Sequence, residues 1–515
     1  KDWNWTGKLQ YSSTDSGFNK GFFLRPFAEL KKKFSKWNNS EAGVNYSLEH
    51  SEIRNRNTNL VNPFSFSFDI WNAFIRSGEQ NTKWKLEFYT RRDRLPVAKQ
   101  LLQTDRSYNY SASVELLGNE HHQLRMNATY RQLVVYNSQV SNLKPEKSLL
   151  GRMEYTVSEF KGGLTGTVLY ETGAGQEQRR DFSYFQVPAG QGEYTWNDYN
   201  GDGVPQINEF ELAAFRDQAR YIRIFTPTLD FVKAGYNQFN YQFALNPRAF
   251  ISPSVNQGFL KWASRLSAQS SLQVFKKEIT SGNFLLNPFS KPVQDTSLIT
   301  LNSTISNTLF YNRTSTVWGW EFTHLMNSAR SFLTYGLETR TLRELNQKLR
   351  WNISKRWSTL LNTRFIRNQL QTPKFNNRNF LISQFSLEPV VSLQQGTSYR
   401  FSLSYKYDLK ENKEGLKERA EIHSLIMEMR YNVLSNSTIN GRFQYSGIEF
   451  TGGSTNTTVA FTMLDALLPG RNFIWNLDFT KRLSNNTEIS VQYNGRKPGT
   501  GKVIHTGQAA VRALF

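Results

Sequence analysis

The chain has 515 residues, of which 14% are aromatic, 20% are charged and none is cysteine. Its mean hydropathy is −0.56, and no apolar run approaches the ~18 residues of a transmembrane helix, which excludes a helical membrane protein. The lack of cysteine excludes disulfide scaffolds, thiolate catalysis, cysteine-ligated zinc and iron–sulfur clusters. The chain opens on Lys1-Asp2-Trp3 without an initiator methionine or a signal peptide, so we expect a processed or truncated product.

The net charge is +21, from 63 Lys and Arg against 42 Asp and Glu. A charge of this sign permits nucleic acid, an anionic membrane surface or an acidic glycan as a partner. The basic residues alternate with aromatic and aliphatic ones, and no basic helix, zinc-finger spacing or RNA-binding aromatic signature occurs. The sequence therefore argues against nucleic acid.

Many segments alternate between polar and apolar residues with the period of two that a β-strand requires. Thr82–Tyr89 places Trp84, Leu86 and Phe88 on one face, and Arg400–Tyr407, Asn472–Thr480 and Glu488–Asn494 repeat the pattern. A soluble β-sandwich also alternates, but its strands average ~5–6 residues, whereas these segments are longer and continue to the end of the chain. Long alternating strands are typical of an outer-membrane β-barrel.

Connection lengths support this interpretation, because barrels join their strands by short periplasmic turns and longer extracellular loops in alternation. The short turns are predicted at Lys36–Ser40, Gly78–Asn81, Gly118–His121, Lys161–Gly163, Asn312–Thr314, Ser354–Arg356, Gln394–Thr397, Ser435–Ser437 and Ser484–Asn486. The longer stretches are predicted at Ser13–Lys20, His50–Pro63, Arg92–Arg106, Tyr136–Lys147, Gly173–Thr228, Ile279–Asp295, Thr372–Arg378, Lys410–Glu418, Ile448–Asn456 and Arg496–Lys502.

The predicted fold is all-β: one transmembrane antiparallel up-and-down β-barrel over residues 1–515, with an extracellular insertion at 173–228. With both termini periplasmic, the strand number must be even. We reach about 22 strands by treating Phe332–Ser354 and Thr457–Leu483 as one long strand each and assigning Phe182–Val187 to the insertion. Prolines in Asn246–Ile279 leave 24 strands open.

The insertion contains the one motif with metal chemistry. Residues Asp198 to Glu209 match the calcium-loop pattern D-x-[DN]-x-[DN]-G-x₅-E without a mismatch. Calcium prefers six to eight oxygen ligands, and this spacing supplies them in an EF-hand. The predicted ligands are Asp198, Asn200, Asp202, the backbone carbonyl of Val204, Gln206 directly or through water, and Glu209. The alternative is an Asn/Asp/Gly-rich turn that binds no ion.

The surroundings of this motif differ from those of a paired EF-hand. Nothing before Asp198 predicts an entering helix, and Pro205 is atypical inside the loop, whereas Phe210–Phe215 is expected to begin an exiting helix. A single unpaired loop of this kind is expected to bind calcium weakly, at ~10⁻⁴–10⁻³ M, as a structural clip in a calcium-rich exterior.

No pattern for catalysis is present. None of the six histidines lies in an H-E-x-x-H motif, and neither a nucleophile elbow nor a phosphate-binding glycine loop occurs. The pair His121-His122 falls in a predicted turn, where solvated side chains are the expectation, and His423 and Ser424 are adjacent and so belong to opposite faces of a strand. We therefore predict a protein that is not an enzyme, with no catalytic residue and no organic cofactor.

The last predicted strand ends on an aromatic residue, Phe515. It resembles the assembly signal that the barrel-assembly machinery of Gram-negative outer membranes recognises. With the aromatic-rich strands and the Asn-Gly-Asp-Gly loop, the chain resembles outer-membrane β-barrel proteins of the Bacteroidota. It is similar in strand number to TonB-dependent transporters. That class has an N-terminal plug, whereas here the strand pattern starts at about Asp2, so a plug is not expected.

The expected function follows from the size of such a barrel, because a lumen of about 22 strands must be closed by loops, by another domain or by a partner. We expect a non-enzymatic outer-membrane component of a multi-protein assembly that transports, secretes or assembles cargo. The expected partners are outer-membrane lipid and lipopolysaccharide, the barrel-assembly machinery during biogenesis, and lipoprotein or periplasmic proteins. A surface scaffold or adhesin is the alternative, and a diffusion porin is a third reading.

Overall fold

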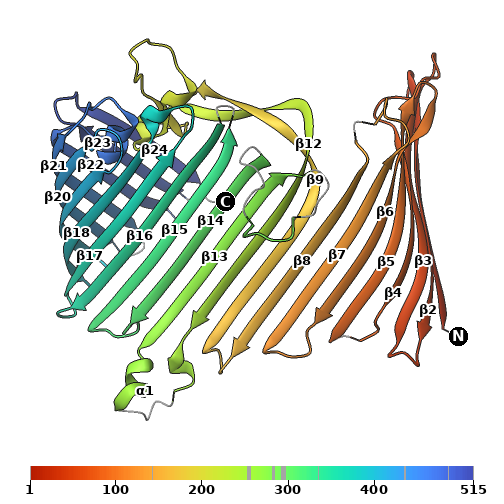
Figure 1. The fold of residues 1–515 in the computed structure, drawn as a ribbon, viewed down its shortest axis with the longest axis horizontal. Helices are drawn as coiled ribbons and strands as arrows, with labels where there is room; N and C mark the ends of the chain where they lie inside the picture. The colour runs from red at the N-terminus through yellow and green to blue at the C-terminus, as the bar shows by residue number, and fades with distance from the viewer. Residues whose placement is uncertain are drawn as a thin grey trace. The chain divides into compact units, whose positions relative to one another are not determined.

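The computed structural model describes residues 2–79, 81–141, 143–251, 257–280, 285–290, 297–333, 336–433, 436–484 and 487–513. Within these ranges the chain forms a 24-stranded antiparallel sheet with a few short helices (Figure 1). No helix in them is long and apolar enough to cross a membrane. The chain divides into two compact units.

The first unit comprises Lys1–Glu177, Phe231–Phe243 and Val274–Val293. Its main part is a meander in which each strand pairs antiparallel with the next along the chain. The strands are β1 (Trp3–Asp15), β2 (Asn19–Phe34), β3 (Ser40–Asn55), β4 (Phe66–Arg76), β5 (Thr82–Val97), β6 (Gln100–Leu116), β7 (His122–Val135), β8 (Glu146–Glu159) and the first part of β9 (Leu164–Gln186).

The second unit comprises Gln178–Asp230, Ala244–Gln273 and Gln294–Phe515. Its main part is a second meander of eleven strands, paired in chain order. These are β14 (Leu298–Tyr311), β15 (Trp318–Leu333), β16 (Gly336–Asn352), β17 (Trp357–Gln371), β18 (Phe380–Gln395), β19 (Tyr399–Asn412), β20 (Arg419–Val433), β21 (Ser437–Thr451), β22 (Gly470–Ser484), β23 (Thr487–Lys497) and β24 (Ile504–Ala513).

The remaining elements come between the two meanders in the sequence, or in the connections within the second meander. They are β10 (Tyr194–Trp196), η1 (Ile207–Glu209), β11 (Phe210–Leu212), η2 (Arg216–Gln218), β12 (Tyr221–Leu245), η3 (Pro247–Ala249), α1 (Gly258–Ala263), β13 (Leu266–Ile279), η5 (Asn376–Arg378) and α2 (Thr458–Met463). The helix α1 precedes β13, at the turn end of that strand (Figure 1).

The two faces of each meander differ in polarity, as the period-two pattern predicts. In the second unit, Leu361, Phe365 and Leu403 are 39%, 47% and 39% exposed. The neighbouring positions on the opposite face are polar and packed: Ser392 and Ser402 share a hydrogen bond of 2.8 Å, and Asn362 donates to Glu388. The apolar side chains are therefore on the open face and the polar ones on the covered face, the reverse of a soluble protein.

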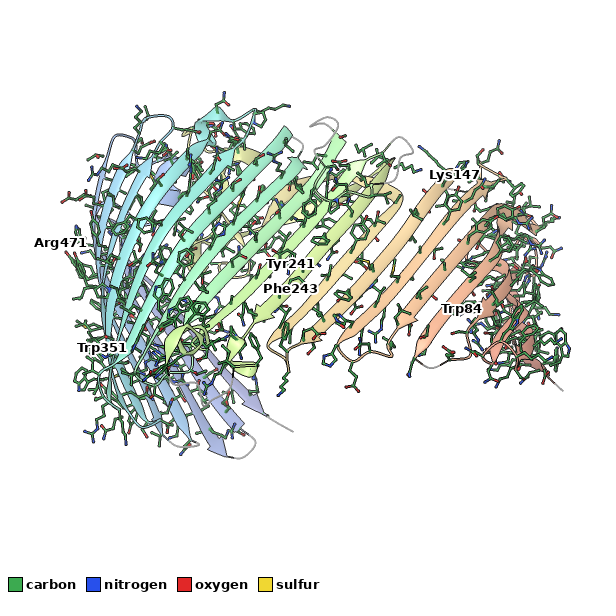
Figure 2. All side chains as sticks on the ribbon, turned by 60° about the horizontal axis from the view of Figure 1, so that its bottom comes forward. Trp84, Lys147, Tyr241, Phe243, Trp351 and Arg471 are labelled. Carbon is green, nitrogen blue, oxygen red and sulfur yellow. The ribbon has the colours of Figure 1, made fainter. Side chains whose placement is uncertain are left out.

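The first unit repeats this arrangement. Phe88 of β5 is paired in register with Tyr110 of β6, and Tyr110 is paired with Tyr130 of β7. Their rings form a row with centroid separations of 5.0 and 6.3 Å. The opposite face carries hydrogen-bonded polar pairs such as Ser111 with Thr129. Side chains project from both faces of the strands in Figure 2.

Aromatic side chains gather on the open face near the turn ends of β14 to β17. Tyr311 and Trp318 lie with ring centroids 5.5 Å apart. Trp351, labelled in Figure 2, and Trp357 are 55% and 46% exposed on the next two strands. Indole and phenol rings in such a row suit a boundary between an apolar medium and water.

The predicted all-β, up-and-down antiparallel architecture is confirmed. Two of the 24 strands, β10 and β11, have three residues each, and the other 22 are 10 to 25 residues long. The estimate of about 22 long strands therefore agrees with the described part of the chain. The C-terminal signal cannot be compared, since Phe515 lies outside the described residues.

The three assumptions behind the strand number differ from the structure. Thr457–Leu483 is not one strand, because it holds helix α2, a loop and then β22. Thr457 caps this helix by accepting a hydrogen bond from the Ala460 amide, which ends the strand pattern. Phe332–Ser354 spans the end of β15 and the whole of β16, and Phe182–Gln186 continues β9 instead of joining the insertion.

Several connections are shorter than predicted. The stretch Arg92–Arg106 is a tight hairpin between Val97 and Gln100, and Ser13–Lys20 contains only a three-residue turn between β1 and β2. Charged side chains in the second half of β5 are paired within the sheet: Arg91 with Asp93 of the same strand, and Arg92 with Asp69 of β4. The polar composition of these stretches predicted loops, but in the structure the strands continue through most of them.

Candidate functional site

The predicted calcium motif lies in the segment between β10 and η1. Its first half is a tight turn in which acidic and amide oxygens accept backbone N–H groups. The Asp198 carboxylate accepts from the amides of Gly201 and Gly203 at 2.7 and 2.9 Å. The Asn200 side-chain oxygen accepts from the Asp202 amide at 2.9 Å, and Asp202 accepts from the Val204 amide at 2.7 Å. Gly201 and Gly203 have φ angles of +78° and +72°, which glycine adopts without strain.

The last predicted ligand, Glu209, occupies a different environment. It is 1% exposed, and its carboxylate accepts hydrogen bonds from the Trp196 indole at 2.8 Å and from the amides of Tyr199 and Gln206. Burial of this charged group is tolerated because it has several donors. Glu209 thus ties the loop to the strand that precedes it.

Gln206 links the two halves of the motif. Its side-chain amide donates to the Asp202 carboxylate at 2.7 Å, and its backbone amide donates to Glu209 at 3.2 Å. The side chain of Val204 is 58% exposed. The structure therefore brings Asp198, Asn200, Asp202 and Gln206 together in one turn and connects Glu209 to them through Gln206.

The donor set fits calcium in kind, since carboxylate and amide oxygens are its preferred ligands. Each Asp198 oxygen accepts one backbone amide and keeps a further lone pair. Among the described residues, however, no three His, Cys, Asp or Glu side chains form a group that could hold a metal. The expected exiting helix at Phe210–Phe215 was wrong, because Phe210–Leu212 forms β11 and pairs with β10.

The strand β11 carries a buried acid that sequence reasoning missed. Glu211 contacts the guanidinium of Arg378 from η5, with 3.2 Å between Oε1 and Nη2, and both side chains are buried. Burial raises the pKa of Glu211, and the positive charge of Arg378 opposes this shift. Burial also raises the pKa of Tyr199 well above its ordinary value, and Glu211 adds to this effect.

Two further contacts join the inserted segment to the loops of the second unit. Arg496 of β23 pairs with Asp217 at 2.7 Å and places its guanidinium over the Phe215 ring, 4.2 Å from the centroid. The Asn456 side-chain amide donates to the Asp198 carbonyl at 3.0 Å. The calcium motif is therefore attached directly to the loop that precedes α2.

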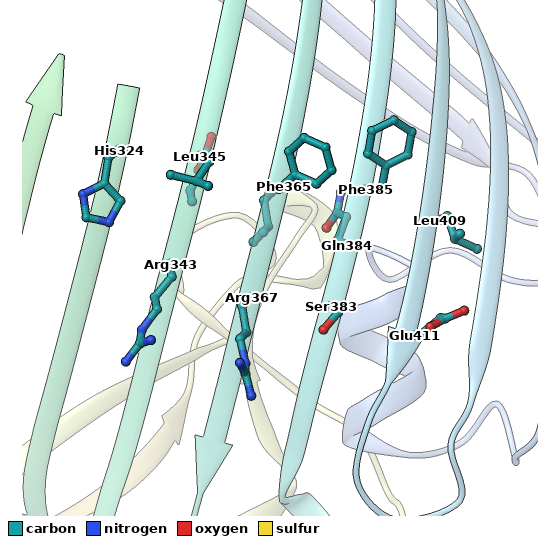
Figure 3. A pocket seen from close by; sticks show the side chains of 12 residues that line it. His324, Arg343, Leu345, Phe365, Arg367, Ser383, Gln384, Phe385, Leu409 and Glu411 are labelled. Atoms are coloured by element: carbon teal, nitrogen blue, oxygen red, sulfur yellow. The ribbon is translucent and has the colours of Figure 1, made fainter. Parts of the chain in front are cut away.

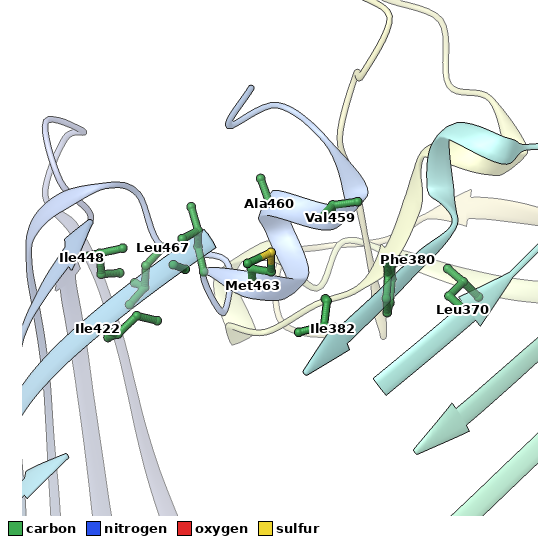
Figure 4. Close-up of a cluster of buried hydrophobic side chains, with 11 residues drawn as sticks. Leu370, Phe380, Ile382, Ile422, Ile448, Val459, Ala460, Met463 and Leu467 are labelled. Atoms are coloured by element: carbon green, nitrogen blue, oxygen red, sulfur yellow. The ribbon is translucent and has the colours of Figure 1, made fainter. Parts of the chain in front are cut away.

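These contacts surround a small hydrophobic cluster, shown in Figure 4. Val459, Ala460 and Met463 of α2 pack on the ends of β17, β18, β20 and β21, and Phe215 of the inserted segment packs against them. The other members of the cluster are Leu370, Phe380, Ile382, Ala420, Ile422, Ile448, Leu464 and Leu467. We call this assembly of residues 194–218, η5 and α2 the cap.

The histidines behave as solvated or structural groups. His121 contacts the Ser158 carbonyl, whereas His122 contacts the Tyr155 hydroxyl at 2.7 Å and Glu159 at 2.9 Å. His423 contacts the Tyr405 hydroxyl, while Ser424 shares a hydrogen bond with Ser446 on the opposite face. The adjacent histidine and serine therefore do not face each other.

The fold and the cap define a class of all-β protein in which one connection of an up-and-down antiparallel sheet carries a small folded segment. No protein-family model and no curated protein sequence matches this chain.

Several solved structures match the chain over most of its length, at very low sequence identity and with TM-scores below 0.5. The FrpB iron transporter of Neisseria meningitidis is 11% identical, with 99% of this chain and 81% of that chain covered and a TM-score of 0.35. The ferric enterobactin receptor PfeA of Pseudomonas aeruginosa is 9% identical, with 100% and 80% covered and a TM-score of 0.36. The ferric-catecholate import receptor Fiu of E. coli K12 is 10% identical, with 93% and 76% covered and a TM-score of 0.32.

The buried pair of Glu211 and Arg378 generates a prediction about the cap. Replacing either residue alone by leucine leaves the other as an unpaired buried charge, which costs about 3–5 kcal/mol. The double replacement should cost less than the sum of the two single replacements. The measurement is hydrogen exchange of the amides of residues 194–218.

The matched control is Arg419→Leu, which removes an exposed arginine that pairs with Glu421 on β20. A fully exposed pair is screened by water and contributes little stability, so exchange in the cap should not change. Strictly additive effects of the two buried replacements would contradict the coupling inferred here.

Proposed function

We propose that the chain is an integral β-barrel of the outer membrane of a Gram-negative bacterium. The observation that carries the proposal is the difference between the two faces of the sheet. The open face carries apolar side chains such as Leu361 and Phe365. Water would make this face unfavourable, whereas lipid acyl chains would cover it. Long paired strands satisfy backbone donors and acceptors within the sheet, as spanning hydrocarbon requires.

The spacing along β17 agrees with the thickness of a membrane. Trp357 and Arg367 are ten residues apart on the open face, which is roughly 34 Å along a strand. At a strand tilt of about 40° this is roughly 26 Å along the membrane normal, close to the ~25 Å apolar band of such barrels. The aromatic row would then lie at one interface and Arg367 at the other.

We propose that the short turns face the periplasm, with both termini, and that the longer loops and the cap face the exterior. The loop between β19 and β20 and the turn at 353–356 offer a matched pair of exposed lysines, Lys417 and Lys355. Lys417→Cys should react with a membrane-impermeant maleimide in intact cells. Lys355→Cys should react only after the outer membrane is permeabilised.

The parent chain has no cysteine, so it is the unlabelled control in this measurement. Labelling of intact cells at position 355 but not at 417 would invert the orientation.

The cap supports a role in an assembly that transports, secretes or assembles cargo at the cell surface. Buried contacts of Arg378 and Arg496 hold residues 194–218 on the strand ends of the second unit. A fixed cover at these strand ends favours control of access over the free arm expected of an adhesin. No catalytic step is proposed, and the partners would be lipoprotein or periplasmic proteins.

Copurification tests this role. Tagged protein extracted from outer membranes should retain at least one partner in a constant ratio, and the purified barrel alone should conduct ions weakly or with gating. A large, steady single-channel conductance without any retained partner would instead indicate a diffusion porin and contradict the proposal.

We further propose that calcium binds Asp198, Asn200, Asp202, the Val204 carbonyl, Gln206 and Glu209. The bound ion would neutralise carboxylates that otherwise repel one another in a short loop. Chelation should therefore increase protease cleavage between Trp196 and Phe215, and Asp202→Ala should reproduce that sensitivity in the presence of calcium. Limited proteolysis followed by mass spectrometry is the measurement.

The control for this experiment is Asp465→Ala, which removes an exposed carboxylate near α2 that belongs to no part of the motif and pairs with Lys410. Its cleavage between Trp196 and Phe215 should keep its response to calcium. If chelator, calcium and Asp202→Ala all give the same cleavage pattern, the motif is only a turn.

A further inference from the structure

We propose that Arg343 and Arg367 bind the phosphate groups of a phosphorylated glycolipid in the outer leaflet. The inference rests on the proposed function, because it requires the open face of the second unit to lie in the outer membrane. It assigns one lipid class to one place on that face.

The two arginines are direct neighbours across two paired strands. Arg343 of β16 and Arg367 of β17 are opposite each other in the register, and both are exposed. They share the open face with Leu345 and Phe365, which are paired with each other one position along the same face. Figure 3 shows the two side chains leaving adjacent strands on the same side of the sheet.

This pair is unfavourable without an external anion. Like charges directly opposite each other on one face of a sheet destabilise it. Among the described residues, neither guanidinium forms an ion pair or a hydrogen bond. By contrast, Lys348 on the other face of β16 pairs with Glu321 at 3.0 Å. The nearby Glu411 contacts Lys413 and lies 4.0 Å from Arg419, so it already has cationic partners.

The surroundings of the pair suit an amphipathic ligand. A depression of about 450 Å³ on the second unit is lined by both arginines and by Leu345, Phe365 and Phe385, among others. The guanidinium groups lie on one side of these apolar side chains, toward the loops (Figure 3). A phosphate on the arginines would thus be continuous with acyl chains on the apolar row. Guanidinium groups bind phosphate with two parallel hydrogen bonds, which favours a phosphorylated lipid over a lipid without phosphate.

The position along the strands selects the leaflet. Arg367 lies four residues before the end of β17, where the loop that contains η5 begins. The aromatic row with Trp357 lies at the other end, beside the short turn at 353–356. With the longer loops outside the cell, the arginines are at the headgroup level of the outer leaflet, and the occupant is its phosphorylated glycolipid.

The experiment uses the full chain in detergent, with binding of added lipid counted by native mass spectrometry. The probes are lipid A with both phosphates, dephosphorylated lipid A, and phosphatidylglycerol. The variants are Arg343→Gln, Arg367→Gln and their combination. The matched control is Arg364→Gln, which removes a charge from the opposite face of the same strand.

We expect the double variant to bind phosphorylated lipid A at least tenfold more weakly than the parent chain, with the single variants in between and Arg364→Gln unchanged. Dephosphorylated lipid A should bind the parent chain at least tenfold more weakly than the phosphorylated form. Phosphatidylglycerol, which carries one phosphodiester instead of two phosphate monoesters, should bind the parent chain at least tenfold more weakly than phosphorylated lipid A.

Equal binding of phosphorylated lipid A to the parent chain and the double variant would overturn the inference. So would equal binding of both forms of lipid A, or binding of phosphatidylglycerol as tight as that of phosphorylated lipid A. Fractionation of cells separates these outcomes from a failure of the proposed function. A parent chain that is absent from the outer membrane contradicts the proposed function, whereas a normally inserted chain with unchanged lipid binding contradicts only this site.

Discussion

The backbone hydrogen-bond ladder is the constraint on which the rest of the structure depends. A chain that crosses hydrocarbon cannot leave a peptide group unpaired, so consecutive strands must pair along their whole length. From β14 to β24 each strand pairs with the next in chain order, along most of its length. Because the ladder supplies the stabilisation, side chains on the two faces are free to match two different media, and no large apolar core is needed.

The cap is stabilised mainly by buried ion pairs and a small apolar cluster instead of a long backbone ladder. Residues 194–218 contribute two very short strands, and charged side chains connect them to the loops of the second unit. Buried ion pairs contribute little net stability, but they are costly to break singly, so they fix one arrangement. The small cluster around Met463 and Phe215 supplies the apolar contact that accompanies them. The cap can therefore be altered without disturbing the ladder.

The sequence was informative where one rule acts over many residues. Period-two alternation predicted the faces of strands such as β5, β19, β22 and β23, because each face meets one medium throughout. It failed at Thr457–Leu483, where apolar residues turn inward to the cap and form α2. It also failed at Arg92–Arg106, where Arg92 and Arg94 pair with Asp69 of the neighbouring strand β4 and the strands continue instead of forming a loop. The Thr457 cap before a short apolar run was the available signal for the helix. The pairing of Glu211 with Arg378 had none, since 167 residues separate them.

Charged side chains are treated differently on the covered face and on the open face of the sheet. On the covered face the charged side chains have partners within the protein: Lys406 pairs with Asp408 of the same strand, and Lys410 pairs with Asp465 of the loop after α2. On the open face an arginine has apolar neighbours, so it is tolerated only near a strand end, where its head reaches polar groups. Arg343 and Arg367 are opposite each other in the register, so two positive charges need a counter-charge at the same place. Their counter-charge would therefore come from outside the chain, and in the membrane placement proposed above the fixed anions at that level are lipid phosphates.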